Sequence, residues 1–324
     1  MLVAGGAGYI GSHTCKSLHD AGYEPVALDN LASGRRDFVR WGPFVEADIR
    51  HSGALIDAMR AHGVTDVVHF ASLISVGESV ADPSLYYDVN VGGSLALLHA
   101  MRVAGVNRIV FSSSAAVYGV PLSDTLDESH PLAPINPYGR SKHMVEAMLR
   151  DHAAAYGLRA RALRYFNACG ADASAELGES HSPETHLIPL ALSATQAGFP
   201  PLRVFGSDYD TPDGTCIRDY IHVTDLASAH VHALQSLDRG DAATAWNVGT
   251  GRGHSVSEII AAIERVTGLQ VNREDAPRRL GDPAKLVANP GLIQRETSWR
   301  PVHSSIENIV ATAWAWHRRD GFAR

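Results

Sequence analysis

The feature that most constrains the fold is a set of three glycines close to the start of the chain. Gly5, Gly8 and Gly11 form the spacing G-x-x-G-x-x-G, directly after the apolar run Leu2–Ala4 and before the amphipathic stretch Ile10–Ala21. A strand that turns through such glycines into a helix lets a ligand phosphate approach the backbone and the helix N-terminus. Ordinary turns and caps also use glycine, but this strand–turn–helix context favours a dinucleotide-binding loop.

Short apolar runs alternate with longer amphipathic stretches through the first half of the chain. We predict strands over Leu2–Ala4, Pro25–Leu28, Phe44–Ala47, Val67–Phe70, Arg108–Ser112 and Arg159–Tyr165. We predict helices between them over Ile10–Ala21, Leu55–His62, Ser84–Ala104 and Asn136–Tyr156. This alternation is typical of βαβ units and therefore of an α/β fold with a doubly wound parallel sheet, the Rossmann fold.

The pattern becomes irregular after about residue 168. Residues 170–186 are polar and loop-like, and helical patterns recur at Leu187–Gln196, Thr224–Leu237 and Ser257–Thr267. We therefore expect a dinucleotide-binding domain over residues 1–168 and a smaller mixed α/β substrate domain over residues 169–324. Residues 215–250 are expected to pack back on the first domain.

Composition excludes several classes of partner. The formal net charge is -7 and no Lys/Arg run occurs, which argues against nucleic acid. No stretch approaches the roughly 18 apolar residues of a membrane span.

The cysteines number 3 and form no C-x-x-C pair, so we expect a reduced, cytoplasmic protein without disulfides or zinc. His181 and His186 are set aside as metal ligands, because we see no carboxylate or cysteine cluster joining them.

An acidic residue indicates which dinucleotide is bound. Asp29 ends the second predicted strand, 18 residues after Gly11. A carboxylate at this point can accept hydrogen bonds from both hydroxyls of the adenosine ribose, and it would repel a 2′-phosphate. The sequence therefore predicts NAD rather than NADP, in preference to reading Asp29 as a turn residue.

A tyrosine and a lysine lie four residues apart near a predicted helix start. Asn136 suits the N-cap and the next residue is proline, so Tyr138 and Lys142 fall on one face of the helix. A nearby ammonium lowers the pKa of a phenol, which is about 10 when unperturbed, so that it can act as a base. Ser112 and Ser114 end the strand before, at the edge where doubly wound sheets bind ligands. A serine there can hydrogen-bond a hydroxyl group that is being oxidised.

Together these features resemble the extended short-chain dehydrogenase/reductases, and among them the UDP-glucose 4-epimerase family. The matching stretches span nearly the whole chain and include GGAGYIGSHT (5–14), FSSSAAVYG (111–119), NPYGRSK (136–142), THLIP (185–189) and RRLGD (278–282). The resemblance implies an isomerase that interconverts UDP-glucose and UDP-galactose at C4 through a 4-keto sugar. It also implies a retained NAD and a cytoplasmic homodimer.

The resemblance further implies roles for matched positions. Tyr138 would be the base, Lys142 its partner, and Ser114 the contact of the sugar 4-oxygen. The positions implied to hold NAD are Gly5, Gly8, Tyr9, Ile10, Gly11, Asp29, Asn30, Asp48, Ile49, Phe70, Ala71, Asn90, Ser112, Tyr138, Lys142 and Tyr165. The positions implied to hold the UDP-sugar are Ser114, Tyr138, Asn167, His186, Leu187, Phe205, Arg218, Arg279 and Asp282. The two arginines fit independently, because a diphosphate suits guanidinium forks.

The chain departs from the family pattern at two positions that bear on ligands. Ile74 stands where many relatives carry lysine, which would remove one phosphate contact and loosen NAD. Leu286 falls where some members carry an aromatic residue that narrows the sugar pocket. A smaller side chain there could admit a 2-acetamido group, so an epimerase of UDP-N-acetylhexosamines is the first alternative.

Other readings stay open at this point. A 4,6-dehydratase would need an acid and a base where Ala115 and Ala116 stand, and a reductase would need an exchangeable cofactor. A non-catalytic NAD-binding module would not need the tyrosine, lysine and serine. For a dimer, helices 84–104 and 137–156 are the candidates, and their apolar residues Tyr86, Tyr87, Leu97 and Met101 suit either an interface or the core.

Overall fold

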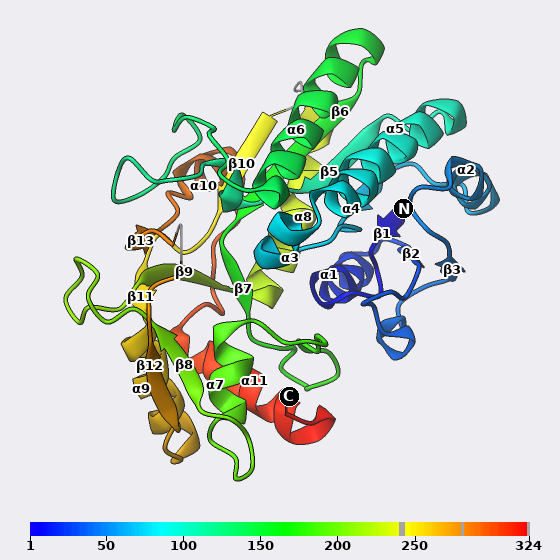
Figure 1. The fold of residues 1–324 in the computed structure, drawn as a ribbon. Helices are drawn as coiled ribbons and strands as arrows, with labels where there is room; N and C mark the ends of the chain where they lie inside the picture. Colours follow the sequence, from blue (N-terminus) through cyan, green and yellow to red (C-terminus); the bar gives the residue numbers. More distant parts are fainter. Residues whose placement is uncertain (240–243, 280–281, 323–324) are drawn as a thin grey trace.

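The structure is a computed structural model that describes residues 1–239, 244–279 and 282–322 (Figure 1). Residues 280 and 281 of the RRLGD stretch and residues 240–243 of the segment expected to pack back lie outside the described residues. The largest sheet contains β1 (Leu2–Ala4), β2 (Val26–Asp29), β3 (Phe44–Glu46), β4 (Val67–His69), β5 (Arg108–Ser112), β6 (Arg159–Tyr165) and β10 (Thr244–Val248). Its strand order is β10-β6-β5-β4-β1-β2-β3, and all neighbours are parallel.

Helices cover both faces of this sheet. On one face lie α2 (Ser52–Ala61), α5 (Gly93–Ala104) and α6 (Pro137–Tyr156), and on the other lie α1 (Tyr9–Asp20), α8 (Val223–Ser236) and α10 (Gly291–Glu296). Alternation along β1 places Leu2 and Ala4 in the first core and Val3 in the second. Strands that are apolar on both faces are what a sheet between two helical layers requires. The predicted doubly wound α/β fold is confirmed.

The bounds of α6 follow from its local sequence. The side chain of Asn136 accepts a hydrogen bond from the Gly139 backbone N–H at 2.8 Å, and Pro137 occupies the first turn. Gly157 ends the helix in the left-handed conformation, with φ 69°. Tyr138 and Lys142 therefore lie in the first two turns of a well-capped helix.

The stretch before α5 differs from the prediction of one regular helix over Ser84–Ala104. The structure has α3 (Val76–Ala81), which was not predicted, then α4 (Pro83–Tyr86), a π-helical segment Tyr87–Gly92 and α5. Asp82 caps α4 by accepting from the Leu85 N–H at 3.0 Å. π-helical turns often occur at functional sites, and this one carries Asn90.

The residues considered for a dimer interface lie mostly in the core. Tyr86 and Leu97 are fully buried, Met101 is 1% exposed, and Tyr87 is half-buried. Leu97 and Met101 pack beneath the sheet with the residues of α2 and α6. An interface role for Tyr86, Leu97 and Met101 is therefore wrong, and of the two interpretations the core one holds.

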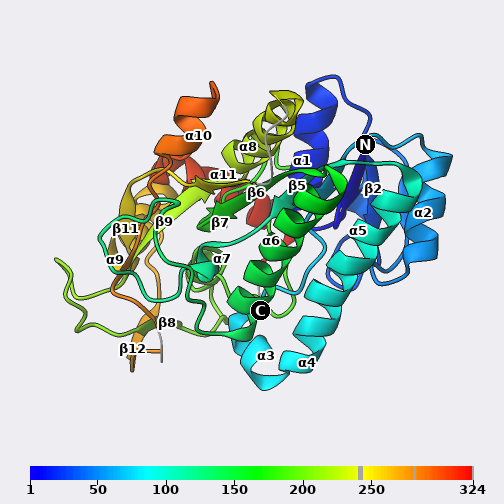
Figure 2. The same cartoon turned by 90° about the horizontal axis from the view of Figure 1, so that it is seen from above.

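Segments after β6 form a second, smaller region of structure to one side of the large sheet (Figure 2). A four-stranded sheet contains β7 (Asn167–Cys169), β9 (Ile217–His222), β11 (Gly253–Ser255) and β13 (Lys285–Leu286), and a parallel pair is formed by β8 (Leu202–Phe205) and β12 (Arg273–Ala276). Their core contains side chains of α7 (Leu187–Ser193), α9 (Val256–Thr267) and α11 (Ile306–Asp320). Single 3-10 turns occur at Arg36–Phe38, Ala115–Val117 and Leu237–Arg239.

Two observations bear on the expected surroundings of the protein. The three cysteines, Cys15, Cys169 and Cys216, are buried free thiols. Among the helices of the described residues, none combines the length and the apolar character that spanning a bilayer would take.

Candidate active site

The glycine loop lies where the strand order reverses, between β1 and β4. Gly5 has φ +81°, and a Cβ atom there would lie 2.6 Å from the backbone nitrogen of Ala71, at the end of β4. A Cβ at Gly11 would lie 2.0 Å from the carbonyl oxygen of Gly5. Both positions therefore need glycine to pack the loop against its own chain. Ligands of doubly wound sheets bind at this kind of switch point.

Gly8 is not packed closely against its own chain. Among the described residues, a Cβ atom there would meet only the Gly5 carbonyl oxygen within 4 Å, at 3.4 Å. Gly8 is also the N-cap of α1 and makes no side-chain cap hydrogen bond. The first N–H groups of α1 are thus left for a ligand, together with the positive end of the helix dipole.

Asp29 holds the glycine loop in place. Its carboxylate accepts from the backbone N–H of Ala7 at 3.1 Å and of Leu31 at 2.9 Å. Burial raises the pKa of Asp29, although these backbone hydrogen bonds act in the opposite direction. A carboxylate has about four acceptor sites, so room remains for hydroxyl donors.

The expected adenine side of the site is braced by charge. Asn30 donates to Asp48 at 3.0 Å, and Arg50 pairs with Asp48 at 2.8 Å. The Arg50 guanidinium holds the pKa of Asp48 well below its usual range. Ile49 is buried, and its Cγ2 lies so close to α5 that a Cβ atom at Gly93 would be 2.5 Å away.

Lys142 is buried, and its ammonium group donates hydrogen bonds to two neighbours. Its ammonium nitrogen donates to the carbonyl oxygen of Ser112 at 2.9 Å and to the hydroxyl of Ser72 at 2.8 Å. The same nitrogen lies 5.8 Å from the centre of the Tyr138 ring. Burial lowers the pKa of Lys142 to about 7. The motif thus brings its two members together, and Ser72 is a partner that the sequence analysis missed, although it directly follows Phe70–Ala71.

Tyr138 and Ser114 form the centre of the site. Burial raises the pKa of Tyr138, and a hydrogen bond with the Ser114 hydroxyl offsets part of the rise. Ser114 also caps the following 3-10 turn by accepting from the Ala116 N–H at 3.1 Å. The methyl groups of Ala115 and Ala116 follow directly in that turn. Neither side chain can transfer a proton, so the turn lacks the acid and base that a dehydratase needs at these positions.

Tyr165 closes the end of β6 against β5. Its hydroxyl and that of Ser112 are 2.5 Å apart. The ring of Phe70 packs on His230 at 4.6 Å between centroids, and the Tyr165 ring lies 6.3 Å from the same histidine. Phe70 and Tyr165 therefore line the same region at the carboxyl ends of β4 and β6.

Asn90 connects the segment after β4 to helix α6. Its amide oxygen accepts from the Leu73 N–H at 2.8 Å, and its amide nitrogen donates to the Leu73 carbonyl at 3.1 Å and the Ser141 hydroxyl at 3.1 Å. The side chain is 2% exposed. It thus fixes the position of α6 next to Lys142.

The two arginines expected to hold a diphosphate share one carboxylate. Arg279 pairs with Asp282 at 3.0 Å, and Arg218 lies 3.6 Å from the other oxygen of Asp282. The Arg279 guanidinium also stacks 4.9 Å above the centre of the Phe205 ring. Arg218 is fixed further by donating to the carbonyls of Ile217 and Pro283. The structure therefore gathers four of the predicted substrate residues: Phe205, Arg218, Arg279 and Asp282.

The second sheet carries other substrate-side residues. Asn167 on β7 donates to the Asp219 carbonyl on β9 at 3.1 Å, and Leu286 on β13 pairs with Arg218 on β9. Leu286 also packs against the apolar cluster that contains Ala115, which lies one residue after Ser114. Leu286 is thus placed between the arginine cluster and the segment that follows Ser114.

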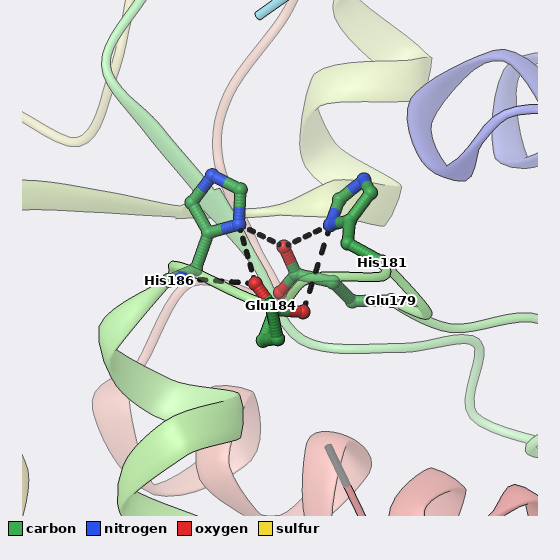
Figure 3. A group of neighbouring side chains, drawn as sticks. All are labelled: Glu179, His181, Glu184 and His186. Atoms are coloured by element: carbon green, nitrogen blue, oxygen red, sulfur yellow. Dashed lines mark hydrogen bonds and ion pairs between the residues drawn. The ribbon is translucent and has the colours of Figure 1, made fainter. Parts of the chain in front are cut away.

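His186 is the N-cap of α7, next to Leu187, and it belongs to a compact group of charged side chains (Figure 3). Its Nδ1 lies 2.8 Å from Glu179 and 2.9 Å from Glu184, and the same two carboxylates flank His181. Burial alone lowers the pKa of His186, but the two carboxylates outweigh it and raise the pKa to about 10. The expectation that no carboxylates join these histidines is wrong: the spacing E-x-H-x-x-E-x-H was visible in the sequence.

Comparisons with known proteins agree with this geometry. Residues 1–249 match the family described as the NAD dependent epimerase/dehydratase family. The UDP-glucose 4-epimerase of Rhizobium leguminosarum bv. trifolii is 50% identical over 319 residues, which cover 98% of this chain and 97% of that protein.

Solved structures are similar over the same length. The UDP-glucose 4-epimerase of Brucella ovis in complex with NAD has a TM-score of 0.95 and 51% identity, covering 97% of both chains. The UDP-glucose 4-epimerase of Bifidobacterium longum in complex with NAD+ and UDP has a TM-score of 0.92 and 36% identity, covering 98% of both chains. This chain therefore belongs to the NAD-dependent epimerase/dehydratase family.

Proposed function

We propose that this protein is an NAD-dependent isomerase that reversibly inverts C4 of UDP-glucose and UDP-galactose through a 4-keto sugar. The observation that carries the proposal is the meeting of Tyr138, Lys142 and Ser114 at the carboxyl end of β5, within the Rossmann sheet that carries the glycine loop. The similarity to UDP-glucose 4-epimerases over nearly the whole chain supports the same activity.

The residues at the switch point fit NAD. The side of Gly8 that a Cβ atom would occupy is nearly free of protein atoms, and the uncapped start of α1 can receive the diphosphate. Asp29, Asn30, Asp48 and Ile49 would hold the adenosine, while Lys142 would hold the second ribose. When bound, NAD would supply a hydride acceptor and donor for C4 of the sugar.

The chain's own residues handle the proton. Tyr138 takes the proton of the sugar 4-hydroxyl and later returns it, while Ser114 keeps the 4-oxygen within reach by hydrogen bonding. A positive charge close to Tyr138 is needed, since burial alone keeps its pKa above the usual value. Lys142 supplies such a charge whenever it is protonated.

The remote part of the substrate gives the binding energy. Arg218 and Arg279 would hold the diphosphate, and Asp282 keeps both guanidinium groups in place. Because UDP is bound strongly, few contacts are needed to hold the sugar. The sugar can therefore rotate between the two hydride transfers while UDP stays in place.

The first experiment is turnover of UDP-galactose by the purified chain without added NAD, measured as UDP-glucose formed. Activity supports both the reaction and a retained cofactor. A requirement for added NAD supports the reaction but contradicts retention. Absence of product with NAD present, from folded protein, contradicts the proposed substrate, and a 4-keto-6-deoxy product would indicate a dehydratase instead.

A substitution separates the enzyme from a non-catalytic NAD-binding module. Tyr138→Phe removes the proton acceptor and is expected to lower kcat about 10²–10⁴-fold with unchanged NAD content. Tyr23→Phe, a tyrosine outside the site, is the matched control. Full activity of Tyr138→Phe would exclude the assigned base.

We also propose that α5 and α6 form the interface of a homodimer. The two helices lie side by side in both views (Figures 1 and 2) and expose Leu95, Val103 and Met144, with 52%, 42% and 45% of each accessible. Leu95→Glu is expected to convert the dimer to monomer in light scattering coupled to size exclusion. Val302→Glu, on a residue 75% exposed outside these helices, should leave the mass unchanged.

A further inference from the structure

The loop between β7 and α7 gathers two carboxylates and two imidazoles. One ligand atom from each of Glu179, His181, Glu184 and His186 can be chosen so that all lie within 4.8 Å of one another. Both histidines present Nδ1 to the carboxylates (Figure 3). Glu179 and Glu184 are 4% and 7% exposed. Two carboxylates so deeply buried require nearby positive charge.

Direct pairing leaves part of this group unsatisfied. Nδ1 of His181 lies 3.3 Å from Glu179 and 3.6 Å from Glu184, at angles that make no hydrogen bond. That Nδ1 atom and Oε2 of Glu184 are buried without a hydrogen-bond partner among the described residues. Buried polar atoms are almost always satisfied in folded proteins. These two unsatisfied atoms lie 3.6 Å apart.

We propose that Glu179, His181, Glu184 and His186 bind one zinc ion. Zinc prefers four nitrogen, sulfur or oxygen ligands in a tetrahedron, and ligands about 2.1 Å from the ion lie about 3.4 Å apart. Four contacts within the group, between 2.8 and 3.6 Å, are close to that spacing, and one ligand atom from each residue lies within 4.8 Å of the others. The ion would accept the lone pairs of the unsatisfied atoms. Its charge of +2 would balance the negative charge of the two carboxylates, with both imidazoles neutral.

The second ligand sphere is already in place. Oε1 of Glu184 accepts from the backbone N–H groups of Thr185 at 2.7 Å and His186 at 2.8 Å. Such contacts orient a carboxylate before a metal arrives. With four protein ligands the coordination is closed, so the zinc is structural and does not take part in the reaction.

The site lies between the two ligand-binding halves of the protein. Residues 170–186, a fully described stretch, contain no helix or strand and lead directly into α7, where His186 and Leu187 are expected to contact UDP. Tyr9, in the first turn of α1, donates to the Gly170 carbonyl at 2.6 Å and packs edge-on to His181 at 6.3 Å. The zinc would thus fix the start of α7 relative to the glycine-loop helix.

The test begins with the wild-type chain, expressed without a histidine tag, treated with a chelator and passed through gel filtration. We expect added zinc to be retained at one ion per chain by elemental analysis and to raise the Tm. Added Co²⁺ should give the intense visible absorption of a tetrahedral complex, lost again when zinc is added. A folded protein that retains no zinc, or gives only a weak octahedral cobalt spectrum, overturns the proposal and leaves a simple ion-pair cluster.

Substitutions then assign the ligands. Glu184→Gln and His181→Asn are each expected to abolish retention of zinc, whereas Glu176→Gln in the same loop and His19→Asn on the surface should retain it. Retention by the Glu184→Gln/His181→Asn double variant overturns the assignment. If those variants do not fold, the cobalt spectrum of the wild type alone decides. Metal content is measured independently of turnover. The zinc proposal can therefore fail while the proposed isomerase activity stands, and the activity can fail while the zinc proposal stands.

Discussion

The ammonium nitrogen of Lys142 donates to the backbone carbonyl oxygen of Ser112 at 2.9 Å, which joins helix α6 to the end of β5. The contact positions Lys142 beside Tyr138, but it holds a cation in a buried place. Burial lowers the pKa of Lys142 to about 7, so protonation of this group opposes folding at neutral pH. The proposed catalytic position of Lys142 is thus reached at a cost in stability.

We predict that Lys142→Met separates these two effects. Activity should fall about 10²-fold or more, since both the charge beside Tyr138 and the proposed ribose contact are lost. The NAD-free variant should be at least as stable as the NAD-free wild type at pH 7. Urea unfolding of both proteins, refolded without NAD, measures the difference; a clear loss of stability in the variant would contradict the cost of burial.

Burial of Lys142 also makes the free energy of unfolding depend on pH, with a defined sign. Between the folded pKa near 7 and the unfolded value of 10.5, the unfolded chain binds the extra proton. The free energy of unfolding of the wild type should therefore rise with pH, relative to Lys142→Met, by about 1.4 kcal/mol per pH unit. Unfolding at pH 7.5 and 9 tests this, and parallel curves would contradict it.

Retention of NAD should depend on Ile74. The residue is 48% exposed and follows Leu73, whose backbone is held by Asn90. Ile74→Lys is expected to add a charged contact to a cofactor phosphate and to lower the Kd for NAD about tenfold, as a charge-assisted hydrogen bond does. Dialysis followed by measurement of bound NAD is the assay. Val80→Lys, 64% exposed on α3, controls for added positive charge alone; equal tightening by both would exclude a specific contact.

Acid sensitivity should come from histidines that fold as neutral groups. Burial lowers the pKa of His13 and His230 to about 4 and of His69 and His222 to about 3. In the unfolded chain these histidines have a pKa of about 6.5, so below pH 6.5 the unfolded chain binds protons that the folded chain does not. The free energy of unfolding therefore falls as the pH falls towards the folded pKa values, by about 1 kcal/mol per pH unit for each group.

Denaturant unfolding at pH 7, 6 and 5, at one NAD concentration, measures this slope. His69→Gln should make this slope shallower by about 1 kcal/mol per pH unit, because one of the buried neutral histidines is removed. His51→Gln, on an exposed histidine, is the matched control. An identical slope in His69→Gln and the wild type would mean that His69 is not buried neutral.

Local signals explain why much of the fold could be predicted. Asn136, Pro137 and Gly157 determine the ends of α6 through hydrogen bonds within a few residues. The alternation that puts Leu2 and Val3 on opposite faces is equally local. The π-helical segment Tyr87–Gly92 was not predictable, because it depends on Asn90 reaching Leu73 and Ser141 in other parts of the chain.

The site was predicted where a motif carries its chemistry and missed where partners are set by tertiary packing. Tyr138 and Lys142 meet because they are four positions apart on one helix, whereas Ser72 reaches Lys142 only once the segment after β4 lies beside α6. Glu179 and His181 lie in a stretch without helix or strand, so their approach depends on the path of a loop. The pairing of Arg218 with Asp282 likewise needs β9 beside β13.

Selectivity for the sugar should depend on Leu286. Leu286 pairs with Arg218 across the sheet and packs on the cluster containing Ala115, so a larger side chain there would reduce the space beside Ser114. Leu286→Tyr is expected to lower the kcat/KM for UDP-N-acetylgalactosamine relative to UDP-galactose by about 10–100-fold, the effect of one misfit group in a pocket. Lys285→Tyr, on the neighbouring residue of β13, is the control. A ratio unchanged in Leu286→Tyr would mean that this residue does not border the sugar, whatever the wild type accepts.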